Sequence, residues 1–192
     1  EMCIRDRCLL ALALVLALAG CGGGSRPTGI RAAETPADDV AEYQPRWRSH
    51  TVDSTQYRKV FLAGTIDMGR SADWQAALVA RFRDSIGGRW LFFNPRRREF
   101  HASPAEMEYQ VAWELAHLEA ADLIVMNLLG DSRSPISLLE MGLYARSGKL
   151  FVACSPDYYR YDNVRITCRR YGVPLYDSLT ALLDDLPQQS DE

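Results

Sequence analysis

The sequence has little that would suit a metal ion, a nucleic acid or a dinucleotide. Its 192 residues include three scattered histidines and five cysteines, and the set of about three or four ligands that a metal site needs is not evident. The formal net charge of −3 gives no electrostatic case for nucleic acid. The glycine spacings of dinucleotide-binding turns and of phosphate-binding loops are both missing. We therefore expect no metal, no other cofactor and no nucleic-acid partner.

The apolar run at residues 8–19 is too short to span a bilayer comfortably. It ends in Leu18-Ala19-Gly20-Cys21, which resembles the lipobox of bacterial lipoproteins, where the chain is cut before the cysteine and the thiol then carries lipid. We therefore expect residues 1–20 to be a signal peptide and Cys21 to be lipidated, which would anchor the protein in the cell envelope outside the cytoplasm. The alternative is a buried helix, but the glycines around Cys21 would end it without a packing partner.

The rest of the N-terminal region is not expected to fold. Residues 1–6, Glu-Met-Cys-Ile-Arg-Asp, resemble the translation of a transposon-end sequencing adaptor, so we expect them to be an assembly artefact. Residues 21–56 are dominated by Gly, Ser, Pro, Thr, Ala and acidic residues and have few apolar side chains to bury, which predicts a flexible tether. Residues 57–192 would then form one domain, which is long enough for a sizeable core.

Strand and helix patterns alternate along this domain. The predicted strands are 59–64, 90–94, 122–127, 150–154 and 173–176, and the predicted helices are 72–86, 104–120, 136–147, 163–171 and 178–186. Repeated βα units with right-handed crossovers give a doubly wound parallel sheet with helices on both faces, which is an α/β fold of three layers. In such sheets a ligand binds at the carboxyl ends of the strands, here over the first and the third.

A single carboxylate stands in the apolar segment that follows the third predicted strand. Glu140 is the only charge in residues 136–145, and a lone carboxylate is costly if it is buried without a partner. We expect Ser134 to cap this helix, Pro135 to occupy its first position, and the helix dipole to keep Glu140 ionised. An ionised carboxylate in a cleft is suited to attack an electrophilic sugar carbon. The alternative is structural, because Ser137 and Glu140 also fit a capping box.

Several motifs together resemble the nucleoside 2-deoxyribosyltransferase-like family. They lie at residues 60–69 with 73–75, at 94–97, at 110–115 and at 134–143, with a weaker one at 163–172. They occur in order over nearly the whole predicted domain and are most similar to a less characterised branch of the family. The resemblance implies a flavodoxin-like five-stranded sheet, a (deoxy)nucleoside or nucleotide as substrate, and a homo-oligomer.

The resemblance also implies two catalytic roles. Glu140 takes the place of the nucleophile that attacks C1′ of the sugar, and Glu114 takes the place of the acid that assists the leaving base. The alternative for Glu114 is a helix-surface position. In the loop after the first strand, Gly64 would let the backbone approach a ligand closely, and Asp67 would accept hydrogen bonds from sugar hydroxyls. The alternative for Asp67 is a solvated turn.

Two positions depart from the transferase pattern. Phe61 stands where the transferases have a tyrosine that touches the nucleophile, and Ser134 stands where they have an aspartate that contacts the base.

Arg96, within the run 96–98, would hold a 5′-phosphate by bidentate contacts, unless this run is only a solvated loop. We therefore expect an enzyme that cleaves or exchanges an N-glycosidic bond through Glu140. The two departures favour the alternative, a non-catalytic nucleotide- or sugar-binding lipoprotein module.

Overall fold

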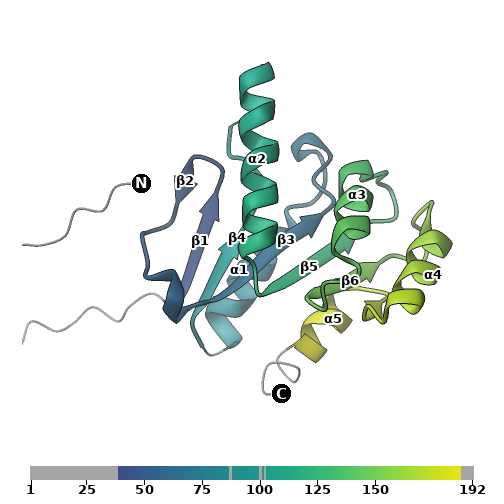
Figure 1. Cartoon of the computed structure of the whole chain (residues 1–192). Coiled ribbons are helices and arrows are strands. Elements are labelled where there is room, and N and C mark those ends of the chain that lie inside the picture. The colour runs from purple at the N-terminus through teal and green to yellow at the C-terminus, as the bar shows by residue number, and fades with distance from the viewer. Residues whose placement is uncertain (1–38, 87, 100, 102, 187–192) are drawn as a thin grey trace, which may run out of the picture. The chain divides into compact units, whose positions relative to one another are not determined.

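The computed structural model describes residues 39–86, 88–99, 101 and 103–186. The predicted signal peptide and the predicted lipidation site at Cys21 lie outside these residues. Within them, a seven-stranded sheet has the order β2-β1-β4-β3-β5-β6-β7 (Figure 1). No helix in this part of the chain combines the length and the apolar character that crossing a bilayer requires.

Five consecutive strands of the sheet are those that the sequence predicts, and the pairings among them are all parallel. They are β4 (Trp90–Phe93), β3 (Arg58–Gly64), β5 (Leu123–Leu128), β6 (Leu150–Cys154) and β7 (Leu175–Tyr176). Their spatial order places the first strand of this set between the second and the third, which is the flavodoxin-like order. The predicted fold class is confirmed.

The sheet has seven strands, however, so the prediction of five is wrong. The additional strands are β1 (Val40–Gln44), which pairs in parallel with β4, and β2 (Trp47–Arg48), which pairs antiparallel with β1. Both come from the segment that the sequence assigns to the tether. Val40 and Ala41 are buried, and β1 covers the edge of β4 that would otherwise expose unpaired backbone groups.

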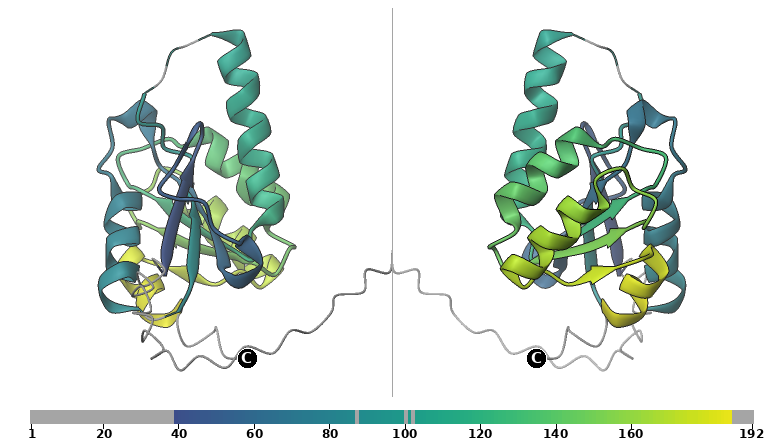
Figure 2. Two further views of the ribbon diagram at one scale, coloured as in Figure 1. Left: turned by 90° about the vertical axis from the view of Figure 1, so that its left-hand side faces the viewer. Right: turned by 90° about the vertical axis from the view of Figure 1, so that its right-hand side faces the viewer.

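Helices cover both faces of the sheet, as predicted. The helices are α1 (Trp74–Ser85), α2 (Pro104–Ala120), α3 (Pro135–Tyr144), α4 (Tyr161–Tyr171) and α5 (Leu179–Asp185). Core residues of α2, α3 and α4 share one apolar cluster with the sheet, and those of α1 and α5 share the other. The side views in Figure 2 show the sheet between these two groups. The three-layer arrangement is therefore confirmed.

Helix α2, which carries Glu114, is fixed at both ends. At its start the Ser103 hydroxyl accepts the backbone N–H of Glu106 at 3.1 Å, and Pro104 occupies the first helical position, where its missing N–H has no cost. At its other end, Lys149 Nζ donates to three backbone carbonyls at 2.7, 3.0 and 3.1 Å. A cation that satisfies these last carbonyls also complements the helix dipole.

Candidate active site

A cavity of about 440 Å³ lies where β3 and β5 end. Its walls come from the loop after β3, from α2 and from the first two turns of α3. Five of the residues predicted for the site line it: Glu140, Glu114, Gly64, Asp67 and Ser134. The cavity is at the carboxyl edge of the parallel strands, which is the place where open α/β sheets bind their ligands.

Glu140 lies in the second turn of α3, and its side chain is 8% exposed. Within the described part of the chain its carboxyl group takes part in no hydrogen bond or ion pair. Burial, and to a smaller extent the nearby charge of Glu114, raises the pKa of Glu140 to about 8. This raised pKa does not support the expectation that the helix dipole keeps Glu140 ionised. The capping-box alternative is also wrong, because α3 begins at Pro135 and Ser137 lies inside it.

Glu114 faces the cavity from α2 and is half-buried. Gln110, one turn earlier, donates from Nε2 to Glu114 Oε1 at 2.7 Å and to the carbonyl of Pro95 at 3.1 Å. Burial raises the pKa of Glu114, and the hydrogen bond from Gln110 opposes that rise. Glu114 is thus a cavity residue rather than a helix-surface residue. Gln110 was not singled out from the sequence as a site residue.

A chain of hydroxyl groups links the two loops at the other wall of the cavity. Ser132 Oγ donates to Asp67 Oδ1 at 2.9 Å, Ser132 and Ser134 Oγ are 2.7 Å apart, and Ser134 Oγ and Thr65 Oγ1 are 2.8 Å apart. Ser134 precedes α3, but its side chain does not cap the helix as predicted, because the hydroxyl is held in this chain. No sequence pattern points to Ser132, which is 3% exposed.

Gly64 ends β3 at a point where only glycine fits. It has a φ of +124°, and a Cβ built there would lie 2.2 Å from the backbone oxygen of Asn127 on β5. The two residues are paired in the sheet, so neither strand can move away without loss of the pairing. Gly64 therefore keeps β3 and β5 close together directly beneath the cavity.

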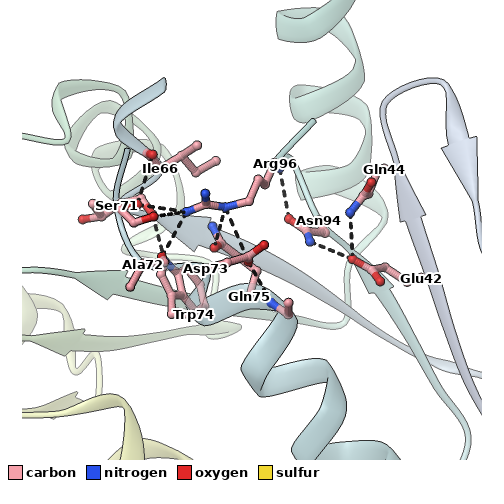
Figure 3. Close-up of polar contacts among 12 residues, drawn as sticks. Glu42, Gln44, Ile66, Ser71, Ala72, Asp73, Trp74, Gln75, Asn94 and Arg96 are labelled. Carbon is pink, nitrogen blue, oxygen red and sulfur yellow. Dashed lines mark hydrogen bonds and ion pairs between the residues drawn. The ribbon is translucent and has the colours of Figure 1, made fainter. Parts of the chain in front are cut away.

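Arg96 does not line the cavity. Its Nη2 donates to Ser71 Oγ at 2.9 Å and to the carbonyl of Ala72 at 3.0 Å, and its Nε donates to Gln75 Oε1 at 3.1 Å (Figure 3). The guanidinium also lies 3.5 Å from Asp73, and the side chain is 11% exposed. The alternative of a solvated arginine is therefore wrong for Arg96. Its contacts fasten the loop that carries Asp67, which leaves the predicted phosphate contact without structural support.

The Asn94-Pro95-Arg96 motif has a structural explanation. Asn94 Nδ2 donates to Glu42 Oε1 on β1 at 2.7 Å, and Asn94 Oδ1 accepts the backbone N–H of Arg96 at 3.0 Å (Figure 3). The motif thereby connects β1, the end of β4 and the loop after β3.

Phe61 is fully buried in the core and does not line the cavity. Its ring is 6.3 Å from that of Trp113 on α2, so it packs between the sheet and this helix. The prediction of a substrate contact for Phe61 is not supported by this position. A phenylalanine suits the place because the core there offers packing partners and needs no hydroxyl.

The fold and the cavity define an α/β protein with two electrostatically coupled carboxylates at the carboxyl edge of its sheet. The profile of the family described as "Nucleoside 2-deoxyribosyltransferase like" matches residues 57–158, which include both carboxylates, and the chain belongs to this family. Membership relates the chain to transferases and glycosidases that act on nucleosides. No curated protein matches the chain.

Among solved structures, the chain is similar to the crystal structure of a conserved protein from Enterococcus faecalis V583. The two sequences are 14% identical, and the TM-score is 0.52. The aligned region covers 69% of this chain and 99% of that chain. A likeness at this level of identity bears on the fold alone.

Proposed function

We propose that the protein cleaves the N-glycosidic bond of a (deoxy)nucleoside or nucleotide through a covalent intermediate on Glu140. The observation that carries this proposal is the carboxyl group of Glu140, which is buried at a cavity wall near a second carboxylate and makes no hydrogen bond to any residue that the structure describes. A carboxyl group that is buried without a hydrogen-bond partner costs stability. Family membership supports the nucleoside as the substrate class.

In the proposed reaction, a carboxylate oxygen of Glu140 attacks C1′ of the sugar. The bond from C1′ to the base nitrogen breaks, its electron pair leaves with the base, and Glu114 gives the base a proton. Water, or a second base, then attacks C1′ of the ester on Glu140, and Glu114 takes the proton of the attacking group. The first outcome is hydrolysis and the second is base exchange, and both regenerate the two carboxyl groups.

The fraction of enzyme that can react depends on which of the two carboxyl groups, Glu114 or Glu140, holds the proton. The reaction needs the proton on Glu114 and the charge on Glu140, whereas the raised pKa of Glu140 favours its neutral form. A coupled pair of this kind titrates as one unit with two apparent pKa values. In the transition state the sugar gains positive charge, which stabilises the ionised form of Glu140. The buried charge of Glu140 therefore interacts more favourably with the transition state than with the bound substrate.

Release of free base from a panel of 2′-deoxynucleosides and ribonucleosides tests the proposal. Chromatography should detect free base with the wild-type protein and none with Glu140→Gln, which keeps the size of the side chain and removes the charge. Glu108→Gln is the matched control, because Glu108 is an exposed glutamate on α2 away from the cavity lining. A 2-fluoro sugar analogue should add its mass to the peptide that contains Glu140. If wild type binds nucleosides but releases no base, the protein is a non-catalytic binding module instead. The absence of a hydroxyl at Phe61 favours this alternative.

We also propose that a second copy of the chain packs over the cavity mouth. Exposed apolar side chains follow one face of α2 and one face of α3: Met107, Val111, Leu115, Ile136, Leu139 and Leu143. Three of them, Met107, Val111 and Ile136, also line the cavity, so a partner that covered this face would exclude water from the site. Light scattering should report an oligomer for wild type, and Leu139→Glu should give a monomer with lower activity. A monomeric wild type would contradict this proposal.

Finally, we propose that lipid on Cys21 anchors the protein outside the cytoplasm. The lipobox-like sequence Leu18-Ala19-Gly20-Cys21 supports this proposal. The substrate would then be an extracytoplasmic nucleoside or nucleotide that is salvaged or degraded there.

A further inference from the structure

The hydroxyl chain beside the cavity has a fixed direction. Ser132 has one hydroxyl proton, which it donates to the carboxylate of Asp67, so the Ser132 oxygen must accept from Ser134. Ser134 must then accept from Thr65, whose oxygen in turn accepts the backbone N–H of Leu129 at 3.1 Å. Every hydroxyl proton of the chain therefore points toward Asp67, and hydrogen bonds that run in one direction strengthen one another.

The backbone around Asp67 is held in a conformation that its residues disfavour. Asp67, Met68 and Ser134 have φ values of 49°, 56° and 39°, which is the left-handed region that residues other than glycine rarely adopt. Side chains of the same loop hold it there, since Arg70 Nε donates to the carbonyl of Asp67 and Ser71 Oγ donates to that of Ile66. Strain that the surroundings maintain in this way is typical of residues that position a ligand.

The position of Asp67 relative to the two glutamates indicates which part of a substrate it meets. In the proposed reaction the base leaves toward Glu114 on α2, and C1′ lies against Glu140 on α3. Asp67 approaches from the loop after β3 and is joined to the residues that precede α3. The sugar carbons beyond C1′ would therefore extend toward Asp67. Its Oδ1 accepts from Ser132, and its Oδ2 accepts no hydrogen bond from the residues that the structure describes, so it is available to a ligand.

We infer that Asp67 selects nucleosides with a free 5′-hydroxyl and disfavours nucleoside 5′-monophosphates. A carboxylate accepts a hydrogen bond from a hydroxyl, but a phosphate offers it only like charge. In this assignment Ser132 is a positioning residue, which acts on the substrate through Asp67. The inference rests on the proposed function, because the placement of the sugar follows from the roles of the two glutamates.

Arg70 is the rival determinant at the same place. It is exposed, it lines the cavity, and it is the one cation among the described residues that do so. Its Nε is directed back to the carbonyl of Asp67 at 3.2 Å, so its contact with its own loop competes with a contact to a phosphate. If Arg70 nevertheless holds a phosphate, the protein should prefer the nucleoside 5′-monophosphate to the nucleoside.

The ratio of kcat/KM for a 2′-deoxynucleoside to that for its 5′-monophosphate tests the inference in the full chain. Wild type should prefer the nucleoside, and Asp67→Asn should shift the ratio toward the monophosphate on the order of tenfold or more, because the like-charge repulsion is gone. Asp131→Asn, which removes an exposed carboxylate from the neighbouring loop, is the matched control and should leave the ratio unchanged. Ser132→Ala should raise KM for the nucleoside more than it changes kcat, and Ser132→Thr should restore it.

Three results would overturn the inference. They are a wild-type preference for the monophosphate, equal ratios in Asp67→Asn and Asp131→Asn, and a loss of monophosphate turnover in Arg70→Gln that leaves nucleoside turnover intact.

Calorimetric binding of the same two ligands to Glu140→Gln separates this inference from the proposed function. If wild type releases no base, but Glu140→Gln binds the nucleoside more tightly than the monophosphate and the double variant with Asp67→Asn loses this preference, the proposed function fails and the selectivity of Asp67 stands. If base is released from both substrates at the same ratio in all variants, the function stands and the inference fails. If neither ligand binds at millimolar concentration, the inference fails as well.

Discussion

Replacement of Glu140 by glutamine should stabilise the domain, and the gain should increase with pH. Glutamine has nearly the size of glutamate, carries no charge, and enters a site where the glutamate makes no hydrogen bond within the described residues. In the wild-type protein, burial raises the pKa of Glu140 from 4.5 to about 8. The folded state therefore holds a proton that the unfolded chain releases over this interval.

The direction of the pH dependence follows from this raised pKa. Below a pH of about 4.5, Glu140 is protonated in both states, so its burial then has no electrostatic cost. Between that value and about 8, the unfolded chain gains the solvation of a free carboxylate while the folded protein does not, and wild-type stability falls. One pKa unit corresponds to about 1.4 kcal/mol, so the gain from Glu140→Gln should reach about 3 kcal/mol near pH 7 at most.

Urea unfolding of the wild type and of Glu140→Gln at several pH values between about 5 and 8 measures this gain. The difference in unfolding free energy between the two proteins should be close to zero at the acidic end and rise steadily toward pH 8. The control Glu108→Gln changes an exposed glutamate on α2 that does not line the cavity, and it should show no such rise. A difference that is independent of pH, or a destabilised Glu140→Gln at every pH, would refute the reasoning.

Three further changes have defined outcomes. Glu114→Gln removes the charge that helps to raise the pKa of Glu140, so base release from good leaving groups should rise at lower pH than in wild type, and poor leaving groups should react far more slowly. Gly64→Ala should destabilise the domain by about 3 kcal/mol or more in urea unfolding, because the new Cβ meets the backbone of Asn127; a stable variant would contradict the close approach. Cys21→Ser should release the full-length protein from bacterial membranes, and mass spectrometry should find lipid on Cys21 only in wild type; equal partitioning of both would count against the anchor.

The sequence predicts best those elements whose signals are local. Helix α2 has the predicted bounds because Ser103 and Pro104 mark its start, and β6 has its predicted bounds because a continuous apolar run is bordered by polar residues. The strands β1 and β2 escaped prediction because they are short and lie in a polar segment. β1 pairs with β4, which lies about fifty residues further along the chain, and β2 pairs in turn with β1, so the pairing that stabilises them leaves little local pattern.

In the candidate site, too, the sequence predicts the residues that have a local signal and not those that depend on long-range contacts. The sequence points to Glu140 and Glu114, because a charge in an apolar run and a family motif are both visible in one dimension. Ser132 and Gln110 are a loop serine and a helical glutamine, and only the tertiary structure reveals that they hold Asp67 and Glu114. The burial of Arg96 likewise depends on contacts with a loop more than twenty residues away.

The burial that reduces the stability of this fold is also what suits Glu140 to the proposed chemistry. In water a carboxylate is well solvated and a poor nucleophile toward a sugar, whereas a desolvated carboxylate regains its lost solvation energy only when positive charge develops beside it. The proposed chemistry also needs a proton donor for the leaving base, and Glu114 suits this role because it lines the same cavity and interacts electrostatically with Glu140. A stabilising substitution at Glu140 should therefore always cost activity, and Glu140→Asp, which keeps the charge, should be the variant that loses least of the chemistry while it gains none of the stability.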